Sequence, residues 1–128
     1  MNQGKIKDFT DLDTWKIAHD LVLSIYKTSK KFPDSEKFGL VSQIQRASVS
    51  ITSNIAEGFG RQSYREKVQF YYLAHGSLIE VKNQLILAKD LEYINNDYFI
   101  KILEKITLSQ KLLQGLIKTL KSFIMNKS

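Results

Sequence analysis

Residues 38–61 read FGLVSQIQRASVSITSNIAEGFGR, with an apolar side chain at every third or fourth position. These positions are Leu40, Ile44, Ala47, Ile51 and Ile55. At about 100° per residue they form one stripe on an α-helix, and the stretch lacks the sustained alternation of a strand. The pattern therefore predicts a long helix over residues 36–57, with Gly58-Phe59-Gly60 as a left-handed stop.

Three further segments show the same helical period. They cover residues 11–31, 63–92 and 97–124, with Asp11, Ser63 and Asn96 as the expected N-caps. The core positions expected in them are Trp15, Ala18, Val22, Ile25 and Ser29, then Val68, Tyr71, Ala74, Leu78, Val81, Leu85 and Ala88, then Phe99, Ile102, Ile106, Leu113, Leu116, Leu120 and Ile124.

These lengths and links predict one architecture. Helices of this size are roughly 30–40 Å long, and short links between them force sequence neighbours to pack antiparallel. The chain has 128 residues, with one proline and six glycines, which suits a single domain of long elements. We therefore expect an all-α, antiparallel up-down-up-down four-helix bundle over residues 11–125, with tails at 1–10 and 126–128.

Several kinds of site are disfavoured by the composition. The chain has no cysteine, and the residues three before His19 and His75 are Lys16 and Tyr72 rather than glutamate, so no metal or cofactor is expected. No nucleophile is accompanied by a base, so no enzymatic activity is expected. The longest charge-free run, residues 68–79, is too short to span a bilayer. We expect a cytoplasmic protein with no membrane partner.

Two of the predicted helices are apolar on more than one side. Arg46 is the only charged residue between Lys37 and Glu57, and residues 68–79 contain none. A lone bundle exposes one face of each helix to water, so a second surface is needed to cover these helices. We infer self-association; the alternative is that these two helices are the more buried pair of a monomer.

A polar stripe runs beside the apolar stripe of residues 36–57. It consists of Gln43, Arg46, Ser50, Asn54 and Glu57. Partly buried groups of this kind need mutual hydrogen bonds, and a buried Arg46 would need Glu57 or an acid on another helix. We interpret the stripe as a structural polar network, with a ligand pocket between helices as the alternative.

Positive charge is concentrated toward the C-terminal end. The net charge is +6, and residues 97–128 contain six lysines against Asp97 and Glu104. Clustered cations attract phosphate, and the N-terminus of a helix favours anions. The candidate nucleic-acid contacts are Arg61, Arg65, Lys67, Lys101, Lys111 and Lys118. The predicted function is binding of an RNA or DNA backbone; the alternative is a scaffold that docks a partner polypeptide.

Specific motifs support a family resemblance. Residues 38–61 contain Ser-Asn-Ile-Ala-Glu-Gly at 53–58, and Gly76-Ser77 is followed by Glu80. With similar segments from about Phe9 to Leu120, the chain resembles the bacterial four-helix-bundle proteins encoded by intervening sequences within 23S rRNA genes.

The resemblance implies a homopentamer with a basic, channel-like surface and without enzymatic activity. Such a bundle is similar to the accessory protein of diversity-generating retroelements, which associates with a reverse transcriptase and binds nucleic acid. The implied partners are therefore copies of the same chain, RNA or DNA, and a reverse transcriptase or another protein.

Overall fold

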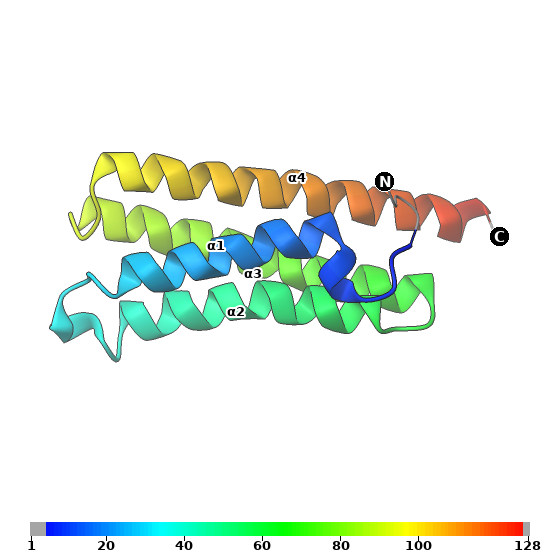
Figure 1. The fold of residues 1–128 in the computed structure, drawn as a ribbon, viewed down its shortest axis with the longest axis horizontal. Helices are drawn as coiled ribbons and strands as arrows, with labels where there is room; N and C mark the ends of the chain where they lie inside the picture. Colours follow the sequence, from blue (N-terminus) through cyan, green and yellow to red (C-terminus); the bar gives the residue numbers. More distant parts are fainter. Residues whose placement is uncertain (1–4, 127–128) are drawn as a thin grey trace.

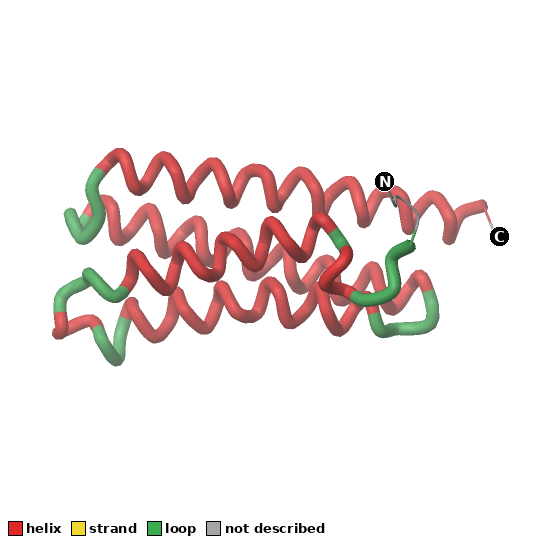
Figure 2. Tube along the Cα trace, viewed as in Figure 1, coloured by secondary structure: helices red, strands yellow, loops and turns green. Residues whose placement is uncertain are grey.

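The computed structural model describes residues 5–126, and this part of the chain folds into four long antiparallel helices (Figure 1). They are α1 (Asp13–Ser29), α2 (Leu40–Phe59), α3 (Tyr64–Asp90) and α4 (Asn96–Asn126). Two short 3-10 helices, η1 (Phe9–Asp11) and η2 (Asp34–Glu36), precede α1 and α2. Within residues 5–126 there is no strand (Figure 2). The predicted all-α four-helix fold is confirmed.

Each helix packs against two others. Helices α1 and α3 both pack against α2 and α4, so the four form a closed bundle with one shared core. The links η2 and 91–95 lie at one end, and the α2–α3 turn lies at the other end with the C-terminal part of α4 (Figure 1). Among residues 5–126, none of the helices combines the length and the apolar character that crossing a bilayer requires.

The predicted core is confirmed most closely for α2 and α3. All five apolar positions of the α2 stripe and all seven expected positions of α3 are buried. On α1 and α4 the buried stripe is wider than predicted, because Leu21 and Ile117 also enter the core. Four expected residues are only partly buried and pack against the edge of the core: Trp15, Phe99, Leu116 and Ile124.

The end of α2 differs from its prediction. Gly60 has φ −78°, and no glycine in the described part of the chain has a positive φ, so the left-handed stop is wrong. Instead, Lys67 Nζ donates to the carbonyl of Phe59 at 2.6 Å and reaches that of Gly58 at 3.4 Å. Gly58 itself is needed for close packing, because a Cβ there would lie 2.7 Å from Tyr71 Cε1. A lysine from α3 therefore caps α2.

Of the three predicted N-caps, only Ser63 is confirmed. Its Oγ accepts from the backbone N–H of Glu66 at 3.1 Å. Asp11 lies in η1, where its carboxylate accepts from the backbone N–H groups of Lys7 and Asp8, and these bonds lower the pKa of Asp11. Asn96 is already the first residue of α4; the side chain of Asn95 caps it instead, accepting from Tyr98 N at 2.8 Å.

One carboxylate ties two connections together at the end opposite the α2–α3 turn. Glu36 Oε1 accepts from the backbone N–H of Leu40 at 3.1 Å, and Glu36 Oε2 accepts from the Tyr93 hydroxyl at 2.7 Å. Because the carboxylate satisfies the first turn of α2 from outside, the helix begins at Leu40 rather than at the predicted residue 36. The hydrogen bond from Tyr93 is the largest cause that lowers the pKa of Glu36.

The lowered pKa of Glu36 makes part of the folding stability depend on pH. A folded-state pKa below the ordinary value of 4.5 contributes stability above that pH, and the contribution is lost as the pH falls through the folded-state value. Between pH about 6 and about 3, the melting temperature of the wild type should therefore fall more than that of Glu36→Gln. Parallel melting profiles would contradict the assignment, and Glu104→Gln, at an exposed position of α4, serves as the control.

Candidate functional site

The C-terminal part of α4 carries an exposed cationic surface. Residues 105–126 contain four lysines and no aspartate or glutamate. Of these lysines, Lys111, Lys118 and Lys121 are exposed, and we call them the α4 cationic face. At about 100° per residue, the three lie within about 80° of one another around the helix. Lys121 was not among the sequence-predicted contacts, although it lies one turn beyond Lys118.

The fourth lysine of this segment has a structural partner. Lys105 Nζ lies 2.9 Å from Asp20 Oδ2 and donates to Ser24 Oγ at 2.6 Å, so it ties α4 to α1. The only other ion pair found among residues 5–126 involves Arg61, so the ammonium groups of the α4 cationic face are without a carboxylate partner in that part of the chain. They are available to a phosphate.

Lys101 lies apart from these three lysines. It is exposed, as predicted, but at 1.5 Å per residue it is about 15 Å along α4 from Lys111. Glu104 is exposed between them. Lys101 therefore extends the positive surface toward the other end of the bundle rather than joining the α4 cationic face.

The predicted cations at the α2–α3 turn have different surroundings. Arg65 is exposed in the first turn of α3. Arg61 Nη2 lies 3.2 Å from Glu57 Oε2, and the guanidinium lies 4.5 Å from the centroid of the Phe70 ring. Lys67 is directed to the end of α2, and burial lowers its pKa. Of the three, Arg65 is the most available, Arg61 is shared with a carboxylate, and Lys67 is used as a helix cap.

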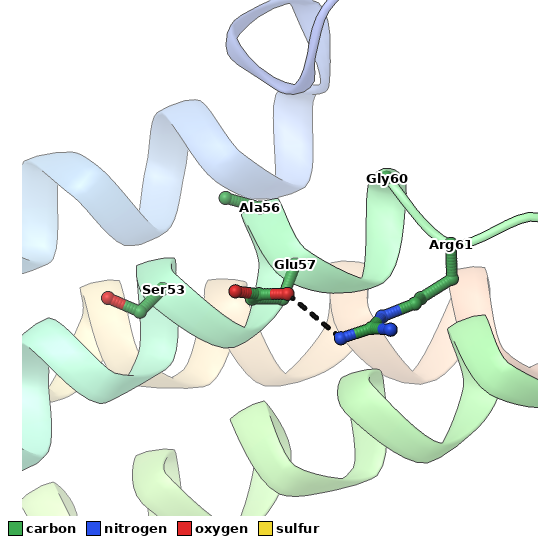
Figure 3. A pocket seen from close by; sticks show the side chains of 5 residues that line it. All are labelled: Ser53, Ala56, Glu57, Gly60 and Arg61. Carbon is green, nitrogen blue, oxygen red and sulfur yellow. Dashed lines mark hydrogen bonds and ion pairs between the residues drawn. The ribbon is translucent and has the colours of Figure 1, made fainter.

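A shallow recess lies beside this turn (Figure 3). It has a volume of about 610 Å³ and is lined by Ser53, Ala56, Glu57, Gly60 and Arg61. The carboxylate and the guanidinium reach toward each other across it, as the dashed line shows. Because both charges are about half exposed, the pair contributes little to stability, and it leaves the recess without an excess of positive charge.

The polar stripe of α2 forms a smaller network than predicted. Asn54 Nδ2 donates to the carbonyl of Ser50 at 2.8 Å and to its hydroxyl at 3.1 Å. Ser77 of α3 completes the group, because its hydroxyl donates to Ser50 Oγ at 2.9 Å. Small hydroxyl side chains thus connect α2 to α3. Ser77 could not be identified as the partner from local patterns, since 27 positions separate it from Ser50.

The other members of the stripe lie outside this network. Gln43 and Arg46 are exposed on α2, and Glu57 pairs with Arg61 instead of Arg46. The prediction that Arg46 is partly buried and paired with Glu57 or another acid is therefore wrong for residues 5–126. The physical reason is the approach of α2 to α3 through small side chains, which leaves the long guanidinium on the outer flank. The neighbouring Gln45 faces inward, where its amide donates to Ser29 Oγ of α1 at 2.9 Å.

A groove between α3 and α4 adjoins the α4 cationic face. It has a volume of about 530 Å³ and is lined by Tyr72, His75, Gln114, Ile117, Lys118, Lys121, Ser122 and Met125. Lys121 Nζ donates to the Tyr72 hydroxyl at 2.9 Å, and Gln114 Nε2 lies 3.3 Å from His75 Nε2. Sequence reasoning missed this groove because its two walls are about 40 residues apart along the chain.

The two histidines do not share a site. His75 lies beside this groove, whereas His19 stacks on Trp15 of α1 with ring centroids 4.5 Å apart. Within residues 5–126 there is no group of three or more histidine, aspartate or glutamate side chains arranged to hold a metal ion. The candidate functional site in this part of the chain is therefore the cationic surface of α4.

Comparison with known proteins places the chain in a family. A family model described as 23S rRNA-intervening sequence protein matches residues 10–115. The fold is similar to a crystal structure from Bacteroides thetaiotaomicron, described as a protein with unknown function from the S23 ribosomal protein family. That likeness has a TM-score of 0.76 and 26% identity, and it covers 82% of this chain and 95% of the other. None of the curated proteins compared with this chain matches it. The chain belongs to the 23S rRNA-intervening sequence protein family.

Proposed function

We propose that this chain is a non-enzymatic, oligomeric helical bundle that binds the sugar–phosphate backbone of RNA or DNA. The observation that carries the proposal is the acid-free segment 105–126, which exposes Lys111, Lys118 and Lys121 without a carboxylate partner in the described chain. The α2–α3 turn lies at the same end of the bundle as the C-terminal part of α4 (Figure 1), and Arg61 in this turn and Arg65 directly after it add positive charge there.

Binding of this type depends on salt more than on sequence. Lysine side chains that contact phosphates release counterions from the nucleic acid, so the affinity falls as the salt concentration rises. Contacts to phosphate position a protein on nucleic acid but carry no direct sequence information. We therefore expect similar affinities for unrelated sequences of the same length and strandedness.

We also propose that the bundle self-associates, as a homopentamer in keeping with the family resemblance. The support is the outer surface of the second half of α3, beyond the turn that contains Tyr72, where large apolar side chains are exposed: Ile79 by 51%, Ile86 by 40% and Leu87 by 47%. Covering such side chains against a second copy removes apolar area from water. Light scattering should show a particle five times the mass of the 14.8 kDa chain, and a monomer at micromolar concentration would contradict self-association.

One observation favours the alternative, a scaffold that docks a partner polypeptide. The Phe38 side chain, between η2 and α2, is 91% exposed, and aromatic side chains are enriched in protein interfaces. The family resemblance points to a reverse transcriptase as one such partner. In that case nucleic acid would bind only through non-specific charge attraction at low salt.

Salt-resolved binding separates these functions. Fluorescence anisotropy with labelled single-stranded RNA and duplex DNA of about 20 nucleotides, at salt concentrations from about 50 to about 200 mM, gives both the affinity and its salt dependence. Nucleic-acid binding predicts measurable affinity for at least one probe at physiological salt. Loss of binding to both probes between low and physiological salt would favour the scaffold.

A further inference from the structure

The groove between α3 and α4 combines an exposed aromatic ring with cations. The side chain of Tyr72 is 48% exposed on one wall, whereas Ile117 is 6% exposed and lies within the opposite helix. Lys118 and Lys121 supply positive charge, and none of the eight lining residues is an aspartate or glutamate. The groove is therefore apolar on its walls and positive overall.

Lys121 contacts Tyr72, and two further polar side chains line the same groove. Lys121 Nζ donates to the Tyr72 hydroxyl at 2.9 Å and lies 5.4 Å from the ring centroid. Gln114 and His75 lie within 3.3 Å of each other between α4 and α3. An amide and an imidazole offer hydrogen-bond donors and acceptors, the groups that read the edge of a nucleobase.

This chemistry fits a planar ring attached to phosphates. Bases stack on aromatic side chains, and adjacent lysines neutralise the phosphates on either side of the stacked base. The volume of about 530 Å³ lies within the range of sites that hold small organic groups. In a duplex the bases are already stacked on one another and do not reach a side chain outside the helix. An unpaired base is free to do so.

We infer that the groove between α3 and α4 takes an unpaired base of a single-stranded nucleic acid, with Tyr72 as the stacking residue and Lys118 and Lys121 on the flanking phosphates. The inference rests on the proposed function and gives it a substrate class. The protein should consequently prefer single strands to duplexes of the same length and charge.

Substitutions of Tyr72 separate stacking from other roles of the residue. Tyr72→Leu keeps an apolar side chain but removes the ring, and Tyr72→Phe keeps the ring but removes the hydroxyl that contacts Lys121. With labelled single-stranded oligothymidine of about 15 nucleotides, Tyr72→Leu should weaken binding about 5- to 100-fold, whereas Tyr72→Phe should stay within about 2-fold of the wild type. Affinity for a duplex of the same length should stay within about 2-fold in both variants. Circular dichroism confirms that each variant is folded.

A tryptophan variant gives a second readout. In Tyr72→Trp, stacking of a base on the indole should quench its fluorescence on addition of the single strand, and the duplex should not. The wild type, with only Trp15, supplies the background, since Trp15 is packed in α1 beside His19.

The outcomes distinguish the inference from the proposed function. If both probes bind in a salt-sensitive manner but Tyr72→Leu weakens neither, or weakens both equally, the base site is overturned while backbone binding stands. If the wild type binds neither probe at physiological salt, backbone binding fails and the base site fails with it. Selective loss of the single strand in Tyr72→Leu, with quenching in Tyr72→Trp, supports the base site.

Discussion

Replacing Lys111, Lys118 and Lys121 together by glutamine is expected to weaken binding of single-stranded RNA about 50-fold at physiological salt. Each lost phosphate contact lowers the slope of log K against log salt by about 0.7, and the loss of three such contacts near 150 mM salt gives roughly this factor. Because all three lysines are exposed, the folding stability should change by no more than about 0.5 kcal/mol per residue. Anisotropy titrations and thermal melts measure the two effects.

The matched control moves the same charge change to the other end of the bundle. Lys27, Lys30 and Lys37 are exposed near the end of α1 and the start of α2, far from the α2–α3 turn (Figure 1). Their joint replacement by glutamine should weaken binding by less than about 5-fold, because only the long-range field of the protein changes. Equal losses in the two triple variants would mean that net charge drives binding and that α4 is no interface.

Gly58→Val is expected to lower the free energy of unfolding by about 3 kcal/mol, at the upper end of the cost of overpacking a core. Gly58 is buried in the last turn of α2. A Cβ at this position would lie 2.7 Å from Tyr71 Cε1 and 3.0 Å from Phe70 Cβ. The Tyr71 side chain is 2% exposed and belongs to the core, so its displacement would disturb the packing of its neighbours. Thermal unfolding should show a drop of roughly 10 °C.

Gly115→Ala is the control for this packing argument. A Cβ at Gly115 meets nothing within 4 Å, and the residue is exposed within α4. Replacing a helical glycine by alanine at an open position should therefore raise the stability by about 0.5–1 kcal/mol. If Gly58→Val were as stable as the wild type, the close approach of α2 to α3 at Tyr71 would be wrong.

The four helices could be predicted from the sequence because local patterns specify them. The apolar stripes from Leu40 to Ile55 and from Val68 to Ala88 each have the period of a buried helical face, and the core residues of α2 and α3 followed directly from them. The ends of the helices were predicted less accurately from the sequence. The end of α2 depends on Lys67, and its start depends on Glu36 and Tyr93, which are 57 positions apart. Contacts between distant segments do not follow from a local period.

The candidate site was predicted only in part for the same reason. Lys111 and Lys118 could be found from charge and helical position alone, and both are exposed. The predicted burial of Arg46 was wrong because the exposure of this side chain depends on how closely α2 approaches α3. The position of Tyr72 beside Lys121 also escaped prediction, since it depends on the antiparallel register of α3 and α4.

The most direct test of the α4 surface is to locate bound nucleic acid on the chain. Ultraviolet crosslinking of single-stranded RNA to the wild-type protein at physiological salt, followed by proteolysis and mass spectrometry, identifies the crosslinked peptides. The structure predicts crosslinks in residues 112–121 of α4 and in the peptide of α3 that contains Tyr72. Crosslinks confined to residues 27–46, at the opposite end of the bundle, would contradict the proposed interface.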